Sequence, residues 1–177
     1  MGRNAGTISK CSIWGVDLLI LITLGTQANS FERLLQEVQN LIHEGYITEK
    51  VIVQAGTTKF HSDCMEIFDF IPIEKFNDLI KSCNLLITHG GVGSIISGLN
   101  NKKKVIAVPR YKKYGEHVND HQLEIVENFN DKQFILGIRE LSELKDAIEK
   151  SKTFQPKQYH SNRQNMIALV ESYIDKM

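Results

Sequence analysis

A glycine-rich segment at residues 89–94 has the residue types expected of a phosphate-binding turn. Glycine has no Cβ, so the backbone can turn sharply there and approach a ligand closely. A buried strand is predicted just before the segment and a helix just after it, and the free N–H groups at the start of such a helix favour an anion. Ser94 can cap that helix or donate to a phosphate oxygen, and His89 adds a donor whose charged form a diphosphate would favour. The candidate phosphate ligands are His89, Gly90, Gly91, Gly93 and Ser94.

The same segment is also compatible with a purely structural turn, in which the glycines serve only the packing of a strand against a helix. Two well-known nucleotide sites are disfavoured by its spacing. No Gly-Lys-Ser/Thr follows, which excludes a Walker loop, and the Gly-x-Gly-x-x-Gly pattern of dinucleotide sites is absent. We therefore do not expect an NAD cofactor.

A second cluster of polar side chains lies at residues 110–122. Six of the seven residues from Glu116 to Gln122 are polar and apolar residues follow at helical spacing, which predicts the polar first turn of a helix over 118–129. One side chain is enough to cap a helix, whereas Asn, Asp and Gln side chains offer the paired donors and acceptors that bind sugar hydroxyls. A solvated helix start is the alternative. The candidate ligands are Arg110, Glu116, His117, Asn119, Asp120, His121 and Gln122.

Two histidines of this cluster raise the question of a metal. His117 and His121 are four residues apart and share a helix face, but the zinc-protease pattern needs Glu where this chain has Val118. No third ligand is evident from the spacing, so we expect no metal site. Arg110 and its lysine neighbours at 112 and 113 favour phosphate, a membrane surface or plain solvent.

Strand-like and helix-like segments alternate along the chain, which predicts a Rossmann-like parallel sheet with helices on both faces. Right-handed crossovers place all strand-to-helix loops at one edge of such a sheet, where ligands bind. The loops at Gly25, at Gly56 and at residues 90–93 should therefore meet. The expected strands are 18–22, 51–56, 65–71 (exposed or at an edge), 85–88, 105–108 and 134–138, and the expected helices are 31–42, 72–80, 95–100, 118–129, 141–150 and 159–175.

The composition is that of one globular domain, with 177 residues of which 42% are hydrophobic. Lys+Arg and Asp+Glu number 21 each, so no overall field favours nucleic acid. Three widely spaced cysteines indicate reduced thiols and a cytoplasmic setting. The apolar run at 13–24 is interrupted by Asp17 and is too short to span a bilayer, so no signal or anchor is expected. We expect a polar extension at 1–15 and a single α/β domain at 16–177.

Taken together, these segments resemble the C-terminal domain of family 28 glycosyltransferases. The resemblance rests on residues 89–94, on Val-Pro-Arg at 108–110, on residues 116–122 and on Thr-Leu-Gly-Thr at 23–26, and it spans about residues 17–150. It extends to the small subunits of two-component bacterial polysaccharide transferases and to their eukaryotic counterpart, which adds the second GlcNAc to the lipid-linked N-glycan precursor. The resemblance implies one half of a GT-B glycosyltransferase that binds a UDP-sugar, with Gly25 and Thr26 among the ligands.

The resemblance also implies roles for single residues. Residues 89–94 would face the diphosphate, with His89 stabilising the leaving group, and His121 and Gln122 would bind the sugar. Related enzymes hold the ribose with a glutamate, where this chain has Ser97. The chain has no Asp-x-Asp, the metal-binding pattern of the other main transferase fold, so a metal-independent reaction is implied. Galactose, glucose, glucuronate and GlcNAc all remain open as the transferred sugar.

The resemblance further implies a partner subunit. No residue is an obvious base, so the base and a lipid-linked sugar acceptor are expected from a membrane-associated partner, which would hold this chain at the inner face of the membrane. The expected pathway is exopolysaccharide or capsule synthesis. An apolar stripe in the predicted helix at 159–175 favours packing on the domain's own sheet, with subunit contact as the second interpretation. A non-catalytic subunit that stabilises or enhances its partner is the alternative function.

Overall fold

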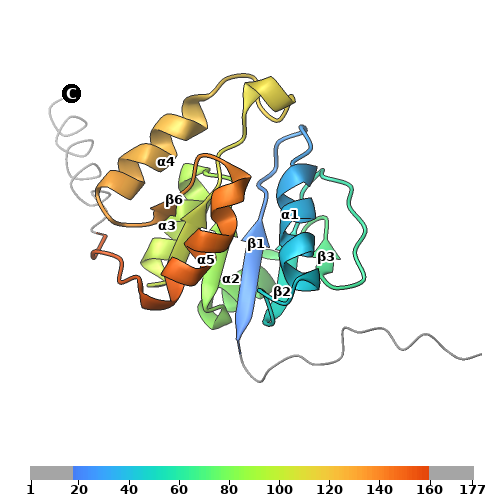
Figure 1. The fold of residues 1–177 in the computed structure, drawn as a ribbon, viewed down its shortest axis with the longest axis horizontal. Coiled ribbons are helices and arrows are strands. Elements are labelled where there is room, and N and C mark those ends of the chain that lie inside the picture. The colour runs from blue at the N-terminus through green and yellow to red at the C-terminus, as the bar shows by residue number, and fades with distance from the viewer. Residues whose placement is uncertain (1–17, 160–177) are drawn as a thin grey trace, which may run out of the picture.

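A computed structural model describes residues 18–159, which form a six-stranded sheet in the order β3-β2-β1-β4-β5-β6. Every neighbouring pair of strands is parallel, as the alternating pattern predicted. Helices lie on both faces of the sheet (Figure 1). The strands are β1 (Leu19–Thr23), β2 (Lys50–Gln54), β3 (Glu66–Phe68), β4 (Leu85–Thr88), β5 (Lys104–Ala107) and β6 (Leu136–Gly137), and the helices are α1 (Glu32–His43), α2 (Ile73–Ser82), α3 (Val92–Asn100), α4 (His121–Asp131) and α5 (Leu144–Thr153).

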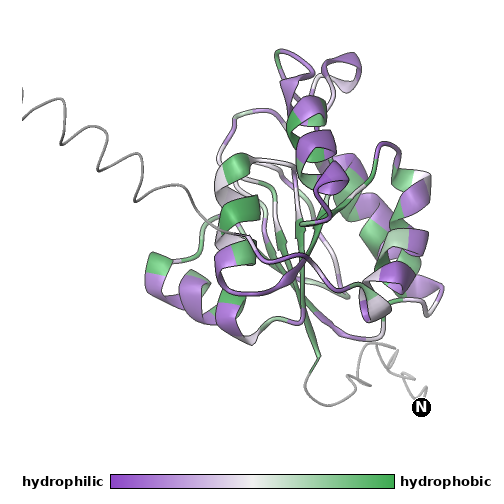
Figure 2. Ribbon diagram, turned by 90° about the vertical axis from the view of Figure 1, so that its left-hand side faces the viewer, coloured by the Kyte–Doolittle hydropathy of each residue, from purple (hydrophilic) through white to green (hydrophobic). Residues whose placement is uncertain are grey.

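Two apolar layers join the helices to the sheet. Successive side chains of a strand point to opposite faces, so Ile20 and Ile22 of β1 pack in the layer under α1 and α5, whereas Leu21 packs under α2, α3 and α4. Figure 2 shows apolar residues concentrated in the strands and on the inner sides of the helices, with polar residues outside. Because both faces of the central strands are covered, they are continuous apolar runs in the sequence.

The polar segment at 115–120 is not helical, so the prediction that a helix begins near Val118 was wrong. Helix α4 begins at His121. The Asp120 carboxylate accepts the backbone N–H of Lys112 at 2.8 Å, and Gly115 adopts a φ of +71°. These local bonds compete with helix formation and hold the preceding residues in a loop.

Other element boundaries also differ from the prediction. Helix α3 begins at Val92, three residues before the predicted start, so Gly93 and Ser94 belong to its first turn. The last predicted strand is reduced to Leu136–Gly137, and the predicted helix at 141–150 is a 3-10 turn followed by α5. The extension at 1–15 and, apart from its first residue, the helix predicted at 159–175 lie outside the described residues.

The order of the strands reverses at β1. The chain runs outward from β1 through β2 to β3, then returns to β4 on the other side of β1 and continues to β5 and β6. A crevice is expected outside the carboxyl ends of the two strands where the direction changes, here β1 and β4. The loops meet there as predicted: a Cβ on Gly56 would lie 2.2 Å from the Gly25 carbonyl oxygen.

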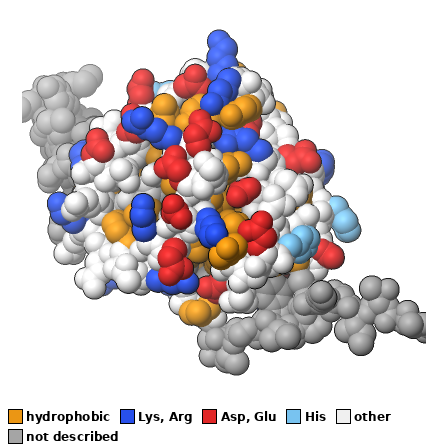
Figure 3. Space-filling model, in the orientation of Figure 1, with side chains coloured by type: hydrophobic (Ala, Val, Ile, Leu, Met, Phe, Trp, Pro, Cys, Tyr) orange, Lys and Arg blue, Asp and Glu red, His pale blue; other side chains and the backbone are white. Residues whose placement is uncertain are grey.

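The outer surface carries charges of both signs. On the face shown in Figure 3, Lys and Arg side chains are interspersed with Asp and Glu side chains. Among the helices of residues 18–159, none has the length and apolar character needed to cross a membrane.

Candidate functional site

A cavity of about 450 Å³ lies at the carboxyl ends of β1 and β4. This volume is within the range of sites that bind small organic ligands. The loops after both strands contribute to the cavity, and α2 and the start of α3 form its sides. The lining residues are Thr23, Gly25, Thr26, Gln27, Gln54, Ile73, Phe76, Asn77, His89, Gly91, Gly93, Ser94, Ser97 and Gln122.

The start of α3 presents free backbone donors to this cavity. Gly91 is the N-cap and no side chain caps the helix, so Ser94 is a residue of the first turn rather than the cap. The first helical hydrogen bond is donated by Ile95 to the Gly91 carbonyl, which leaves the N–H groups of residues 92–94 without an intrahelical partner. A Cβ at Gly93 would meet no protein atom within 4 Å, so this residue borders open space.

His89 is wedged between two glycine loops beneath the cavity. Its side chain is buried, and a Cβ added to Gly25 or Gly91 would lie 2.6 Å or 2.4 Å from its Nε2 atom. Nδ1 lies 3.3 Å from the Thr23 carbonyl oxygen, which can only accept, so Nδ1 carries the proton of the neutral ring. Burial lowers the pKa of His89 to about 4, and the nearby charge of Arg110 acts in the same direction. In the protein alone the imidazole is therefore neutral at pH 7.

Gln122 is the one residue of the 116–122 cluster that lines the cavity. It is buried in the first turn of α4, and its Oε1 accepts the backbone N–H of Arg110 at 3.1 Å. This bond sets the orientation of the amide, because only the oxygen can accept from an N–H group. The amide NH₂ is left to donate on the cavity side.

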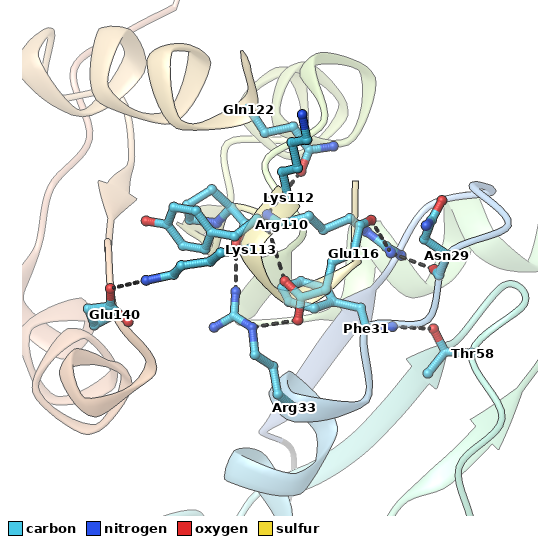
Figure 4. A network of polar contacts seen from close by, with 12 residues as sticks. Asn29, Phe31, Arg33, Thr58, Arg110, Lys112, Lys113, Glu116, Gln122 and Glu140 are labelled. Atoms are coloured by element: carbon cyan, nitrogen blue, oxygen red, sulfur yellow. Dashed lines mark hydrogen bonds and ion pairs between the residues drawn. The ribbon is translucent and has the colours of Figure 1, made fainter. Parts of the chain in front are cut away.

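Arg110 and Glu116 are buried and are absent from the cavity lining. Figure 4 shows the polar contacts of both side chains. The Arg110 guanidinium donates to the carbonyl oxygens of Leu24 at 2.7 Å and Asn29 at 2.6 Å, and burial lowers its pKa to about 10. The Glu116 carboxylate pairs with Arg33 and accepts the backbone N–H of Tyr111 at 3.0 Å. Both side chains are thus turned into the protein.

The remaining predicted ligands of the polar segment contact the first loop, one another or neighbouring residues of their own segment. They are absent from the cavity lining. His117 lies 3.0 Å from the Gln27 amide nitrogen, and Asn119 accepts the backbone N–H of His121. The exposed His121 ring lies 3.1 Å from a carboxylate oxygen of Glu124 and does not reach the cavity. Gly90 supports the turn with a φ of +81° and also does not line the cavity.

The lining of the cavity contains polar groups but no acidic or basic side chain other than His89. It holds amides, hydroxyls and backbone N–H groups but no Lys, Arg, Asp or Glu, and His89 is its one potential metal ligand among the described residues. A separate group, His43, Asp63 and Cys64, has ligand atoms within 4.8 Å of one another but contributes nothing to this lining. The cavity therefore suits an anion held by dipoles and hydrogen bonds without an acidic metal site.

Several lining residues were not predicted from the sequence. Ile73, Phe76 and Asn77 of α2 share one helix face at spacings of three and four, and Ile73 is 70% exposed. The sequence carries no signal for this side, because the spacing of Ile73, Phe76 and Ile80 is that of an ordinary buried helix face. Gln54 ends β2 and accepts the backbone N–H of Ile71, and its polar side chain at a strand end was an available signal.

Comparison with known proteins gives one family and a consistent fold. The family described as the glycosyltransferase family 28 C-terminal domain matches residues 19–177. The chain is 31% identical over 90 residues to the UDP-N-acetylglucosamine transferase subunit ALG13 of Candida albicans, covering 50% of this chain and 29% of that protein. It thus spans under a third of this curated relative.

Solved structures share the fold at low identity. The NMR structure of ALG13 has a TM-score of 0.53 and 18% identity, covering 82% of this chain and 90% of that one. Os79 from O. sativa, solved in complex with UDP, has a TM-score of 0.56 and 13% identity, covering 78% of this chain and 32% of that one. The glycotransferase of kitacinnamycin has a TM-score of 0.58 and 16% identity, covering 85% of this chain and 38% of that one. The predicted fold, one half of a GT-B transferase, is confirmed.

Proposed function

Because the chain belongs to the glycosyltransferase family 28 C-terminal domain family, we propose that it binds the UDP-sugar donor of a glycosyltransferase. One observation carries this proposal: the cavity opens onto the uncapped start of α3 and contains no carboxylate. A diphosphate needs donors and a positive potential, and free N–H groups at a helix start supply both. A carboxylate in the lining would repel it.

The two sides of the cavity suit the two ends of the donor. The Gln122 amide, held by Arg110, can donate to a sugar hydroxyl, and the Thr26 hydroxyl borders the same space. On the α2 side, Ile73 and Phe76 offer apolar surface for a planar base, and Ser97, which also lines the cavity, can serve a ribose hydroxyl. The diphosphate then lies between them, against the first turn of α3.

Transfer from such a donor breaks the bond between the anomeric carbon and the diphosphate oxygen as an acceptor hydroxyl attacks that carbon. Negative charge develops on the leaving UDP, and preorganised N–H groups lower the barrier by stabilising it. The imidazole of His89 lies below the same loops, with its Nδ1 proton committed to Thr23 and its Nε2 lone pair free. An incoming diphosphate favours uptake of a proton at Nε2, which would turn His89 into a further donor.

The acceptor and the base are assigned to a partner. Deprotonating the acceptor hydroxyl needs a base. The lining contains no Asp or Glu, and its one imidazole, His89, is assigned here to the leaving diphosphate. We therefore propose that a membrane-associated subunit supplies the base and a lipid-linked sugar acceptor, and that this chain works at the membrane through that partner in exopolysaccharide or capsule synthesis. The similarity to ALG13, described as a transferase subunit, supports a divided enzyme.

Calorimetric titration of the full chain with UDP and with UDP-sugars tests the donor site. Binding in the micromolar to millimolar range is the expected result, and sugar-dependent affinity would identify the donor. No heat and no thermal stabilisation at millimolar UDP would overturn the proposal in favour of a non-catalytic subunit. Co-purification with the partner and transfer assays over a panel of UDP-sugars then test the divided enzyme.

A further inference from the structure

Arg110 connects the two loops that flank the glycine-rich turn. Its guanidinium donates through Nη2 to the Leu24 carbonyl at 2.7 Å and through Nη1 to the Asn29 carbonyl at 2.6 Å. These two carbonyls bracket the β1–α1 loop, whose residues 25–27 line the cavity. A single side chain therefore clamps both ends of one cavity wall.

The position of Arg110 in the fold explains why an arginine is needed there. It follows β5, whereas Leu24 follows β1, and β4 lies between these strands. Neighbouring strands are about 4.8 Å apart, so the contact crosses roughly 9–10 Å. A guanidinium reaches across this gap and presents several donors in a fixed plane, whereas a lysine has a single nitrogen.

The backbone of the same residue controls the opposite wall. The N–H of Arg110 donates to Oε1 of Gln122 at 3.1 Å, which leaves the amide NH₂ to the cavity. Arg110 thus contacts the β1–α1 loop with its side chain. Its main chain contacts Gln122, the residue proposed to bind the sugar. Its charge also acts at His89, where it disfavours the imidazolium form.

A second group of contacts holds Arg110 itself (Figure 4). The Phe31 ring lies under its guanidinium with the centroid 4.9 Å away, and the Glu116 carbonyl accepts from Nη1 at 3.3 Å. The Glu116 carboxylate is fixed in turn by Arg33, which also donates to the Pro109 carbonyl at 2.9 Å. These contacts hold the guanidinium in place, because moving a buried charge away from its acceptors is costly. Nε is the one nitrogen of the Arg110 side chain that is buried without a hydrogen-bond partner.

We propose that Arg110 is a positioning residue that holds the β1–α1 loop and the Gln122 amide in the geometry that receives the donor, a role that rests on the proposed function. It does not touch the ligand itself. Its effect on UDP binding passes through the loop, since its side chain is turned away from the cavity lining. Its main-chain bond to Gln122 acts on the sugar of a UDP-sugar instead.

Substitution Arg110→Lys tests this role because it keeps the positive charge but removes the planar guanidinium that donates to two carbonyls at once. UDP affinity measured by calorimetry should fall about tenfold, which corresponds to a loss of about 1.4 kcal/mol of binding free energy. Amide exchange should become faster in residues 24–31 and remain as in the wild type in β2 and α5. Arg139→Lys is the matched control, since Arg139 pairs with Glu127 at the surface and should keep wild-type affinity and exchange.

The outcomes separate this inference from the proposed function. If the wild type does not bind UDP, the proposed function fails. If the wild type binds UDP, two results for a folded Arg110→Lys variant overturn only the role of Arg110. One is wild-type UDP affinity with wild-type amide exchange in the loop, and the other is an equal rise of amide exchange in all segments. Should the variant not fold, NMR of the wild-type guanidinium N–H groups answers the same question: UDP should shift the Arg110 signals and leave those of Arg139 in place, and unshifted Arg110 signals would refute the role.

Discussion

Substitution Gly93→Ala separates fold stability from ligand binding at the start of α3. Gly93 has helical backbone and its added Cβ would meet no protein atom within 4 Å, so alanine fits the folded protein without strain. Alanine also loses less backbone freedom on folding than glycine, which stabilises a helix by about 0.5–1 kcal/mol. The free energy of unfolding should therefore rise, and the midpoint of thermal unfolding should increase by about 1–4 °C.

The same methyl group occupies the space assigned to the diphosphate. Inserting a methyl into a closely packed contact costs about 1–3 kcal/mol, so the affinity for UDP should fall about 5- to 150-fold. Thermal unfolding followed by circular dichroism and calorimetric titration with UDP measure the two effects on one preparation. A more stable protein that binds UDP more weakly is the expected combination.

Gly98→Ala is the matched control on the same helix. Its Cβ would lie 2.7 Å from Val105 Cγ2 and 2.8 Å from Leu86 Cδ2, so overpacking should lower stability by about 1–3 kcal/mol. Below its unfolding transition this variant should bind UDP like the wild type. Wild-type UDP affinity in a folded Gly93→Ala variant would show that the diphosphate does not lie against α3, and the proposed site would be wrong.

Three further predictions address single side chains. Gln122→Ala should weaken UDP-sugar binding by about 1–3 kcal/mol while UDP alone binds nearly as before, because only the sugar loses a donor; equal losses for both ligands in calorimetry would contradict this assignment. The pKa of His89 is 6.5 in the unfolded chain and about 4 in the folded protein. As the pH falls, the unfolded chain therefore takes up a proton first. The folded state is stabilised by the neutral ring above pH 6.5, and this stability is lost progressively toward pH 4. Urea unfolding should show a loss of about 2 kcal/mol between about pH 7.5 and about pH 5 that is missing in His89→Asn. Burial raises the pKa of the Cys83 thiol to about 11, so a disulfide reagent near pH 8 should label Cys83 only after denaturation, as peptide mass spectrometry would show.

Much of the fold follows from local patterns in the sequence. The apolar runs at 18–22 and 85–88 became the central strands β1 and β4, because strands covered on both faces are apolar at nearly every position. The start of α4 was missed because the bond from Lys112 to Asp120 joins residues eight apart and overrides the helical pattern. The edge strand β6 is shorter than its apolar run, since most of that run packs in loops around it.

The sequence by itself determined the parallel α/β architecture, the glycine-rich turn before α3 and the meeting of the strand-to-helix loops at one edge. These features depend on residue type and short spacing. Only the tertiary structure decided which polar residues face the cavity: Gln122 does, whereas Arg110, Glu116 and His121 turn elsewhere. The direction of a buried side chain depends on its partners, and Arg110 finds the Leu24 carbonyl 86 residues away along the chain, a distance over which no local pattern carries information.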